Sequence, residues 1–96
     1  MAHIPQKRAH IIYSGTVQGV GFRWTAEALA NSIGLGGWVQ NCPDGSVEVV
    51  CEGGEKDISA FTARIKKEMN NYIRSEKVNW EIPTGEFEGF NIKFYY

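Results

Sequence analysis

A glycine-rich segment that ends in an arginine is the part of the sequence best suited to chemistry. Residues 15–21 read Gly-Thr-Val-Gln-Gly-Val-Gly, and Phe22 and Arg23 follow directly. Glycines allow successive backbone amides to turn toward one concavity, which can then bind an oxyanion. If a helix begins at Phe22, its first amides can bind the same anion, and the Arg23 guanidinium can donate to two phosphate oxygens. The segment predicts a phosphate pocket that needs no metal ion.

Two well-known phosphate-binding motifs do not match this segment. A Walker loop needs Lys followed by Ser or Thr after its last glycine, and that pair is absent here. The glycine spacing also differs from the dinucleotide-binding fingerprint. Glycine spacing alone therefore leaves a simpler alternative open, in which a tight strand-to-helix turn carries a surface arginine.

The elements on either side of the glycine segment must position it. Residues 8–14 are rich in β-branched and aromatic residues and predict a strand. A helical period of apolar residues then predicts a helix from Phe22 that ends at Gly34. Residues 36–41 and 46–52 predict a hairpin in which residue 42 faces residue 46 and residue 37 faces residue 51.

The rest of the chain completes a two-layer pattern. A second helical period runs from Ile58 to Met69, and two alternating segments, 78–82 and 90–94, predict strands. The order βαββαβ favours an α+β sandwich with one antiparallel sheet and both helices on a single face. We expect a flexible leader over residues 1–7 and one domain over residues 8–96. The aromatic residues near the end, Phe94, Tyr95 and Tyr96, are expected to pack in the core or against the sheet.

Composition and charge exclude several classes of protein. The 96 residues carry a net charge of −1, which argues against a protein that mainly coats nucleic acid. No apolar run is long enough to span a membrane and no secretory signal is present, so we expect a cytoplasmic protein. The predicted register places Cys42 and Cys51 about 16 Å apart along the hairpin, which predicts two free thiols. The histidines, His3 and His10, have no partner at metal-binding spacing, so no metal site is predicted.

Two segments at a characteristic separation resemble a known family. The run from Gly15 to Arg23 resembles the first signature of the acylphosphatase family, and the runs 34–41 and 44–48 resemble the second. The resemblance extends over about residues 8–96. It implies a ferredoxin-like sandwich that hydrolyses the carboxyl–phosphate anhydride bond of small acyl phosphates. The expected products are a carboxylate and inorganic phosphate, formed by in-line attack of water without metal or cofactor. We expect a monomer with no nucleic-acid or membrane partner.

The resemblance also assigns roles to individual residues. It makes Arg23 the phosphate-binding arginine and Asn41 the residue that positions the attacking water. It assigns phosphate binding by backbone amides to the loop residues Gly15, Thr16, Val17, Gln18, Gly19, Val20 and Gly21. Thr16 and Gln40 stand where many relatives carry basic residues, which predicts a less positive pocket.

Two alternative functions stay open from the sequence. The domain could bind acyl phosphates without turning them over, or serve as an accessory domain. A sheet of this topology could also bind single-stranded RNA, although the charge of −1 argues against that interpretation. Asn41 could be a turn residue, because asparagine is common at hairpin turns.

Overall fold

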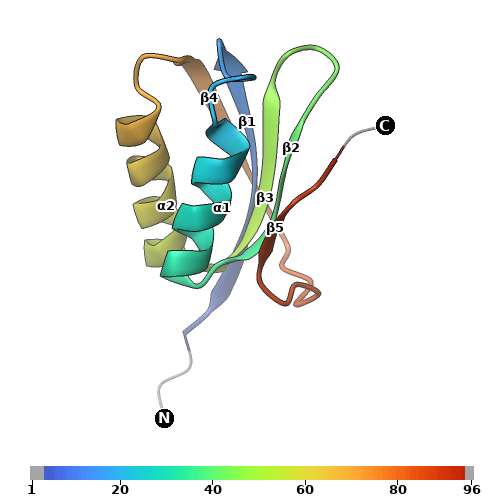
Figure 1. Cartoon of the computed structure of the whole chain (residues 1–96). Coiled ribbons are helices and arrows are strands. Elements are labelled where there is room, and N and C mark those ends of the chain that lie inside the picture. The colour runs from blue at the N-terminus through green and yellow to red at the C-terminus, as the bar shows by residue number, and fades with distance from the viewer. Residues whose placement is uncertain (1–3, 95–96) are drawn as a thin grey trace.

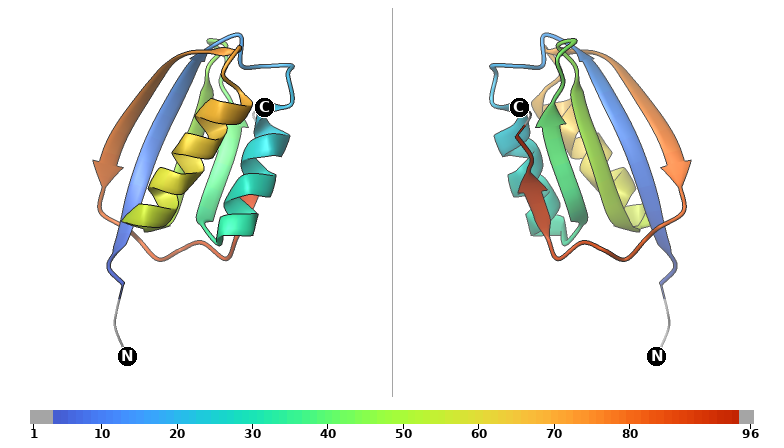
Figure 2. Two further views of the ribbon diagram at one scale, coloured as in Figure 1. Left: turned by 90° about the vertical axis from the view of Figure 1, so that its left-hand side faces the viewer. Right: turned by 90° about the vertical axis from the view of Figure 1, so that its right-hand side faces the viewer.

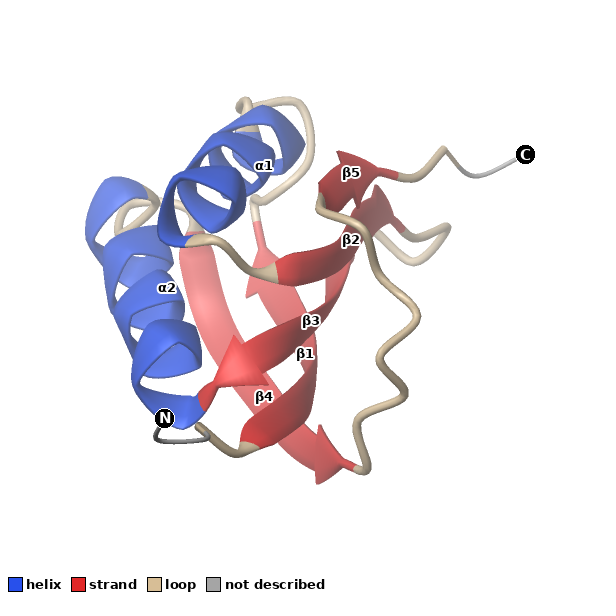
Figure 3. Ribbon diagram, turned by 90° about the horizontal axis from the view of Figure 1, so that it is seen from below, coloured by secondary structure: helices blue, strands red, loops and turns tan. Residues whose placement is uncertain are grey.

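Two helices lie on one face of a sheet in the computed structural model, which describes residues 4–94 (Figure 1). The view along the sheet in Figure 3 shows the same two layers. In chain order the elements are β1 (Gln6–Gly15), α1 (Phe22–Ile33), β2 (Gly36–Asn41), β3 (Val47–Gly54), α2 (Glu55–Glu68), β4 (Ile73–Glu81) and β5 (Phe90–Ile92). The predicted α+β sandwich of the ferredoxin-like kind, with both helices on one face, is confirmed.

The sheet has the strand order β4-β1-β3-β2-β5. The first four strands pair antiparallel, as predicted, but β5 pairs parallel with β2, so the prediction of an antiparallel sheet is wrong for this edge. β4 ends at the end of the sheet where β2 begins, and residues 82–89 pass along that end (Figure 2). A strand that starts there and pairs with β2 must run in the same direction as β2.

The hairpin register is the predicted one. Gly37 faces Cys51, and Asn41 faces Val47. Cys42 and Cys51 are both free thiols, as expected from the separation that this register imposes. The register also places Asn41 at the last position of β2, next to the turn.

The first strand is longer than predicted. β1 begins at Gln6, and Gln6 and Lys7 pair with Gly54 and Gly53 of β3. Two residues of the predicted leader therefore belong to the sheet, while residues 1–3 lie outside the described residues. The strand is longer because β3 extends to Gly54 and offers backbone partners to both residues.

The core fills the space between the helices and the sheet. Both predicted helical periods are correct, and α1 ends at Gly34 as expected. Each fully buried aliphatic or aromatic side chain contributes about 1.5–3 kcal/mol of hydrophobic stabilisation. The largest fully buried side chains are Tyr13, Phe22, Phe61, Phe90, Ile11, Leu35, Ile58, Ile65, Val17, Val39, Val47 and Val49.

The two last strands differ in extent from the predicted segments. β4 begins at Ile73 and ends before Ile82, which is exposed. β5 ends at Ile92, before Phe94. The Asn31 carboxamide fastens β5 to α1, since its Nδ2 donates to Phe90 O at 3.0 Å and its Oδ1 accepts from Phe90 N at 3.0 Å.

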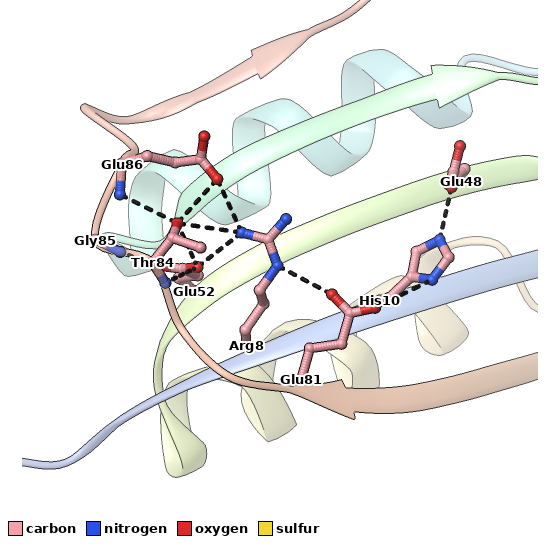
Figure 4. A network of polar contacts seen from close by, with 8 residues as sticks. All are labelled: Arg8, His10, Glu48, Glu52, Glu81, Thr84, Gly85 and Glu86. Atoms are coloured by element: carbon pink, nitrogen blue, oxygen red, sulfur yellow. Dashed lines mark hydrogen bonds and ion pairs between the residues drawn. The ribbon is translucent and has the colours of Figure 1, made fainter.

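The face of the sheet away from the helices carries a network of polar side chains (Figure 4). Arg8 forms ion pairs with Glu52 at 2.8 Å, Glu81 at 3.1 Å and Glu86 at 3.1 Å. His10 Nε2 lies 2.6 Å from Glu48 Oε2. This network ties β1 and β3 to the segment between β4 and β5.

Candidate active site

The loop after β1, the start of α1 and the tip of the β2–β3 hairpin lie at the same end of the sheet (Figure 1). A cavity of ≈ 210 Å³ lies at this end, lined by residues of the loop, of α1, of the end of β2 and of β5 and the segment after it. Arg23 and Asn41, which the sequence predicts to act together, both face this cavity. Its lining residues are Val17, Gly19, Gly21, Phe22, Arg23, Asn41, Ile92 and Phe94.

The loop presents free backbone amides beside the cavity. Gly19 and Gly21 have φ values of 76° and 81°, which residues with a side chain rarely adopt. α1 begins without a side-chain cap, and its first internal bond runs from Thr25 N to Gly21 O at 3.0 Å. Within residues 4–94, the amides of residues 17–21 donate to no protein acceptor. Such a cluster of free amides at a helix start can bind an anion.

The first two residues of the predicted loop, Gly15 and Thr16, lie away from the cavity. Gly15 belongs to β1 and pairs with Ile73 of β4. The Thr16 amide donates to Tyr72 O at 2.9 Å, so this amide is already used within the protein. Neither residue lines the cavity, and the side chains of Gln18 and Val20 do not line it either.

Arg23 brings a positive charge to the cavity. Within the described chain, Arg23 forms no ion pair, whereas Arg8 contacts three carboxylates. The Arg23 guanidinium lies over the ring of Phe94, with Cζ 5.5 Å from the ring centroid. An anion in the cavity would therefore meet a guanidinium that has no competing partner among residues 4–94.

Asn41 brings a carboxamide to the same cavity. Its Oδ1 is buried and has no hydrogen-bond donor within the described residues. An unpaired buried acceptor costs about 1–3 kcal/mol, which a bound water molecule would recover. The carboxamide can also turn by 180° about its terminal torsion, which exchanges Oδ1 with Nδ2. Either atom can thus be presented to a ligand.

Gln18 links the loop to the hairpin that carries Asn41. Its Nε2 donates to Cys42 O at 2.8 Å and to Ser46 O at 2.9 Å. The sequence predicts only a backbone role for Gln18, since nothing in the local pattern shows which distant carbonyls its side chain reaches. Asp44 Oδ1 closes the same turn by accepting from Ser46 N at 2.9 Å.

Two of the groups next to Asn41 lie away from the cavity. The Gln40 carboxamide donates to Glu48 Oε1 at 2.7 Å on the opposite face of the sheet. The Cys42 thiol donates to the same oxygen at 3.7 Å. Burial and the nearby Glu48 carboxylate raise the pKa of the Cys42 thiol, so the thiol stays neutral at pH 7.

Phe94 has a different environment from the predicted one. Its side chain is 60% exposed and lines the cavity, rather than packing in the core. Trp24, the neighbour of Arg23, is 74% exposed. The alternating pattern of residues 90–94 predicts a strand. It cannot show that β5 ends at Ile92, that Lys93 N still donates to Val39 O at 2.8 Å, or that Phe94 lies at the cavity. Tyr95 and Tyr96 lie outside the described residues.

A family model described as Acylphosphatase matches residues 9–92, which include the loop, Arg23 and Asn41. The chain belongs to the acylphosphatase family. An acylphosphatase of Thermococcus kodakarensis is 44% identical over 87 residues, which cover 88% of this chain and 93% of that protein.

Solved structures of the acylphosphatase fold agree with this assignment. The crystal structure of acylphosphatase from Bacillus subtilis superposes with a TM-score of 0.82 at 32% identity, covering 91% of this chain and 98% of that one. HypF of T. kodakarensis superposes with a TM-score of 0.78 at 35% identity. In that case the match covers 91% of this chain but 12% of HypF.

Residues 4–94 contain no group of three or more His, Cys, Asp or Glu side chains that could hold a metal ion. No helix within the same range is long and apolar enough to cross a bilayer.

Proposed function

We propose that this chain is an acylphosphatase, which hydrolyses the anhydride bond between a carboxyl group and a phosphate. The observation that carries the proposal is one cavity lined by Arg23, Asn41 and a loop whose amides at residues 17–21 donate to no acceptor within residues 4–94. The family membership of residues 9–92 supports the same reaction.

The phosphate end of the substrate binds between the loop and the arginine. The amides of residues 17–21 and the Arg23 guanidinium donate to the phosphate oxygens. Phosphoryl transfer passes through a loose transition state, which needs chiefly positioning and charge stabilisation. A site made of amides and one guanidinium can supply both, because its donors are fixed before the substrate arrives.

Asn41 positions the attacking water. Its Oδ1 accepts a hydrogen bond from the water, whose oxygen then forms a bond to phosphorus as the bond to the acyl oxygen breaks. The carboxylate leaves with the electron pair of that bond. A neutral carboxamide does not take a proton at pH 7, so the proton of the water passes to a phosphate oxygen. Fixed orientation of two reactants supplies up to about 7–11 kcal/mol of the barrier.

A few properties follow as expectations of the same proposal. The reaction uses no metal or cofactor, and the chain acts as a monomer on small acyl phosphates. Two free cysteines are typical of a reducing compartment, which supports the cytoplasm as the location.

Hydrolysis of benzoyl phosphate, measured in the presence of a chelator, tests the reaction. Arg23→Ala removes the guanidinium, so we expect competitive inhibition by inorganic phosphate to weaken at least tenfold while the circular dichroism spectrum is kept. Arg64→Ala is the matched control, because Arg64 is an exposed arginine on α2. If phosphate inhibited both variants equally, Arg23 would not be a phosphate-binding residue.

Asn41→Ala tests the second role. Loss of the water-positioning amide should lower kcat roughly 100-fold or more, with a smaller change in phosphate inhibition. Asn79→Ala, which removes an exposed carboxamide from β4, should keep wild-type turnover. Normal turnover by Asn41→Ala would contradict the proposed role.

The likeness to HypF favours a second candidate function, that of an accessory domain without turnover of its own. This fold forms 12% of the HypF chain there. The curated T. kodakarensis acylphosphatase, by contrast, is covered over 93% of its length. Absence of benzoyl phosphate hydrolysis by the folded wild-type chain would select the accessory function.

A further inference from the structure

The side chain of Gln18 joins the two halves of the cavity. One half is the loop of residues 17–21 with its free amides, and the other is the hairpin tip that carries Asn41. The carboxamide Nε2 of Gln18 donates one hydrogen bond to Cys42 O at 2.8 Å and a second to Ser46 O at 2.9 Å. Among the described residues, it is the only side chain of residues 16–21 that donates to the hairpin.

The two carbonyls that Gln18 binds belong to the hairpin rung that lies next to Asn41. Cys42 follows Asn41 directly, and Cys42 N donates to Ser46 O at 2.9 Å in the last rung of the hairpin. Any displacement of this rung relative to the loop changes the separation between Asn41 and the anion-binding amides. Within residues 4–94 no backbone amide of residues 17–21 donates a hydrogen bond, and this part of the loop contains two glycines, so the bonds from the Gln18 side chain support it.

We propose that Gln18 is a positioning residue for acyl phosphate hydrolysis, acting through Asn41. It sets the separation between the loop amides that hold the phosphate and the carboxamide that orients the water. Gln18 is not among the lining residues, so it acts without touching the substrate through its side chain. This inference rests on the proposed function, because it assigns Gln18 to the same reaction.

The carbonyls keep other donors when the Gln18 amide is removed. Cys42 O also accepts from Gly45 N at 3.1 Å, and Ser46 O also accepts from Cys42 N. Replacement of Gln18 by methionine, which has a similar length and no donor, therefore leaves no buried carbonyl unpaired. A variant that lacks only this link should fold, because the large cost of an unsatisfied polar group is avoided.

Gln18→Met should lower kcat for benzoyl phosphate about 10- to 100-fold, the effect of moving a reacting group by about 1 Å. Inhibition by inorganic phosphate should change less than kcat, since the loop amides and Arg23 remain. Gln40→Met is the matched control, because Gln40 precedes Asn41 but bonds to Glu48 on the other face of the sheet. We expect Gln40→Met to keep kcat within twofold.

A double-mutant cycle with Asn41→Ala separates positioning from a purely structural role. If Gln18 acts through Asn41, Gln18→Met should cause no further loss of kcat in the Asn41→Ala background. Independent, multiplicative losses would overturn the proposal, and so would a folded Gln18→Met enzyme with wild-type kcat. A parallel loss of phosphate affinity and kcat would also overturn it.

A second variant and the activity of the wild-type chain distinguish failure of this inference from failure of the proposed function. If Gln18→Met does not fold, Gln18→Asn keeps both donors on a side chain one methylene shorter, and the same cycle with Asn41→Ala applies. An inactive wild-type chain would refute the proposed function itself. An active wild-type chain with additive variants would refute only the role of Gln18.

Discussion

At the scale of single residues, Gly37 shows how closely the strands beside the site approach one another. It has a φ of 143°, and a Cβ at this position would lie 1.9 Å from Val50 O. No side-chain rotation can relieve that clash, because the atom that it meets belongs to the backbone of β3. The pairing of β2 with β3 thus requires glycine at position 37, and the position of Asn41 depends on this pairing.

Gly37→Ala should lower the free energy of unfolding by at least about 2 kcal/mol, through backbone strain and displacement of β3. Urea denaturation followed by circular dichroism measures this change. Gly45→Ala is the control, since Gly45 has a φ of 93° and nothing within 4 Å of the added Cβ. Only the conformational cost of roughly 1 kcal/mol should appear there. Equal losses in both variants would show that the close contact with Val50 is unimportant.

At the scale of elements, β5 is bonded to α1 as well as to the sheet. The strand has 3 residues and pairs only with β2 among the described strands. Asn31 on α1 supplies both a donor and an acceptor to the backbone of Phe90, which is buried. A strand this short is held in place by the helix side chain as well as by its ladder.

Asn31→Ala should cost about 1–3 kcal/mol of stability, because it leaves two backbone groups of Phe90 without partners. It should also raise KM for benzoyl phosphate, since Ile92 and Phe94 line the cavity. Thermal denaturation and steady-state kinetics measure the two effects. Ser32→Ala, which removes an exposed hydroxyl from the same helix, should change neither. An unchanged melting temperature in Asn31→Ala would show that β5 is held by its strand pairing alone.

Local patterns predicted the elements well and the distant contacts poorly. The apolar periods placed α1 and α2, and the turn residues between Asn41 and Ser46 set a hairpin register that fixes which residues face one another. The direction of β5 was missed, because strand pairing depends on where residues 82–89 carry the chain. The hydrogen bonds of Gln18 were missed for the same reason, since they reach 24 and 28 residues along the chain.

Some of the predicted site residues line the cavity and others do not. Arg23 and Asn41 came from two signatures whose spacing is specific, and both line the cavity. The glycine segment also includes Gly15 and Thr16, but Gly15 pairs with Ile73 of β4 and the Thr16 amide donates to Tyr72 O just before β4. Phe94 was missed because an apolar residue near the end of a strand pattern ordinarily packs in a core.

At the scale of the whole molecule, the Glu52 carboxylate connects three parts of the chain. It accepts from Arg8 of β1 and from the backbone amides of Thr84 and Gly85, which precede β5. Its side chain is 8% exposed. Burial opposes ionisation, but the hydrogen bonds from Thr84, Arg8 and Gly85 outweigh it and hold the pKa of Glu52 below its ordinary value.

This lowered pKa makes the fold sensitive to acid. The unfolded chain binds a proton at Glu52 more readily than the folded one, so the stabilisation is complete above the ordinary glutamate pKa of about 4.3. It should be lost as the pH falls below that value and through the lower pKa of the folded state. Urea midpoints measured between pH 7 and pH 3 should fall less steeply with pH in Glu52→Gln than in the wild type. Glu88→Gln, at an exposed position, is the control, and its urea midpoints should follow the wild-type curve. If the midpoints of Glu52→Gln fell as steeply with pH as those of the wild type, Glu52 would not be a source of the acid sensitivity.

The parallel pairing of β5 with β2 has a practical consequence for anyone who modifies this molecule. Val39 faces Ile92 in that pairing, so Phe94 comes level with Asn41, and both residues border the cavity. β1 begins at Gln6, at the other end of the sheet (Figure 1). A dye or an affinity handle joined directly after residue 94 would start beside the cavity, where it can obstruct a ligand. The same group placed ahead of residue 4 would start a full strand length away from it.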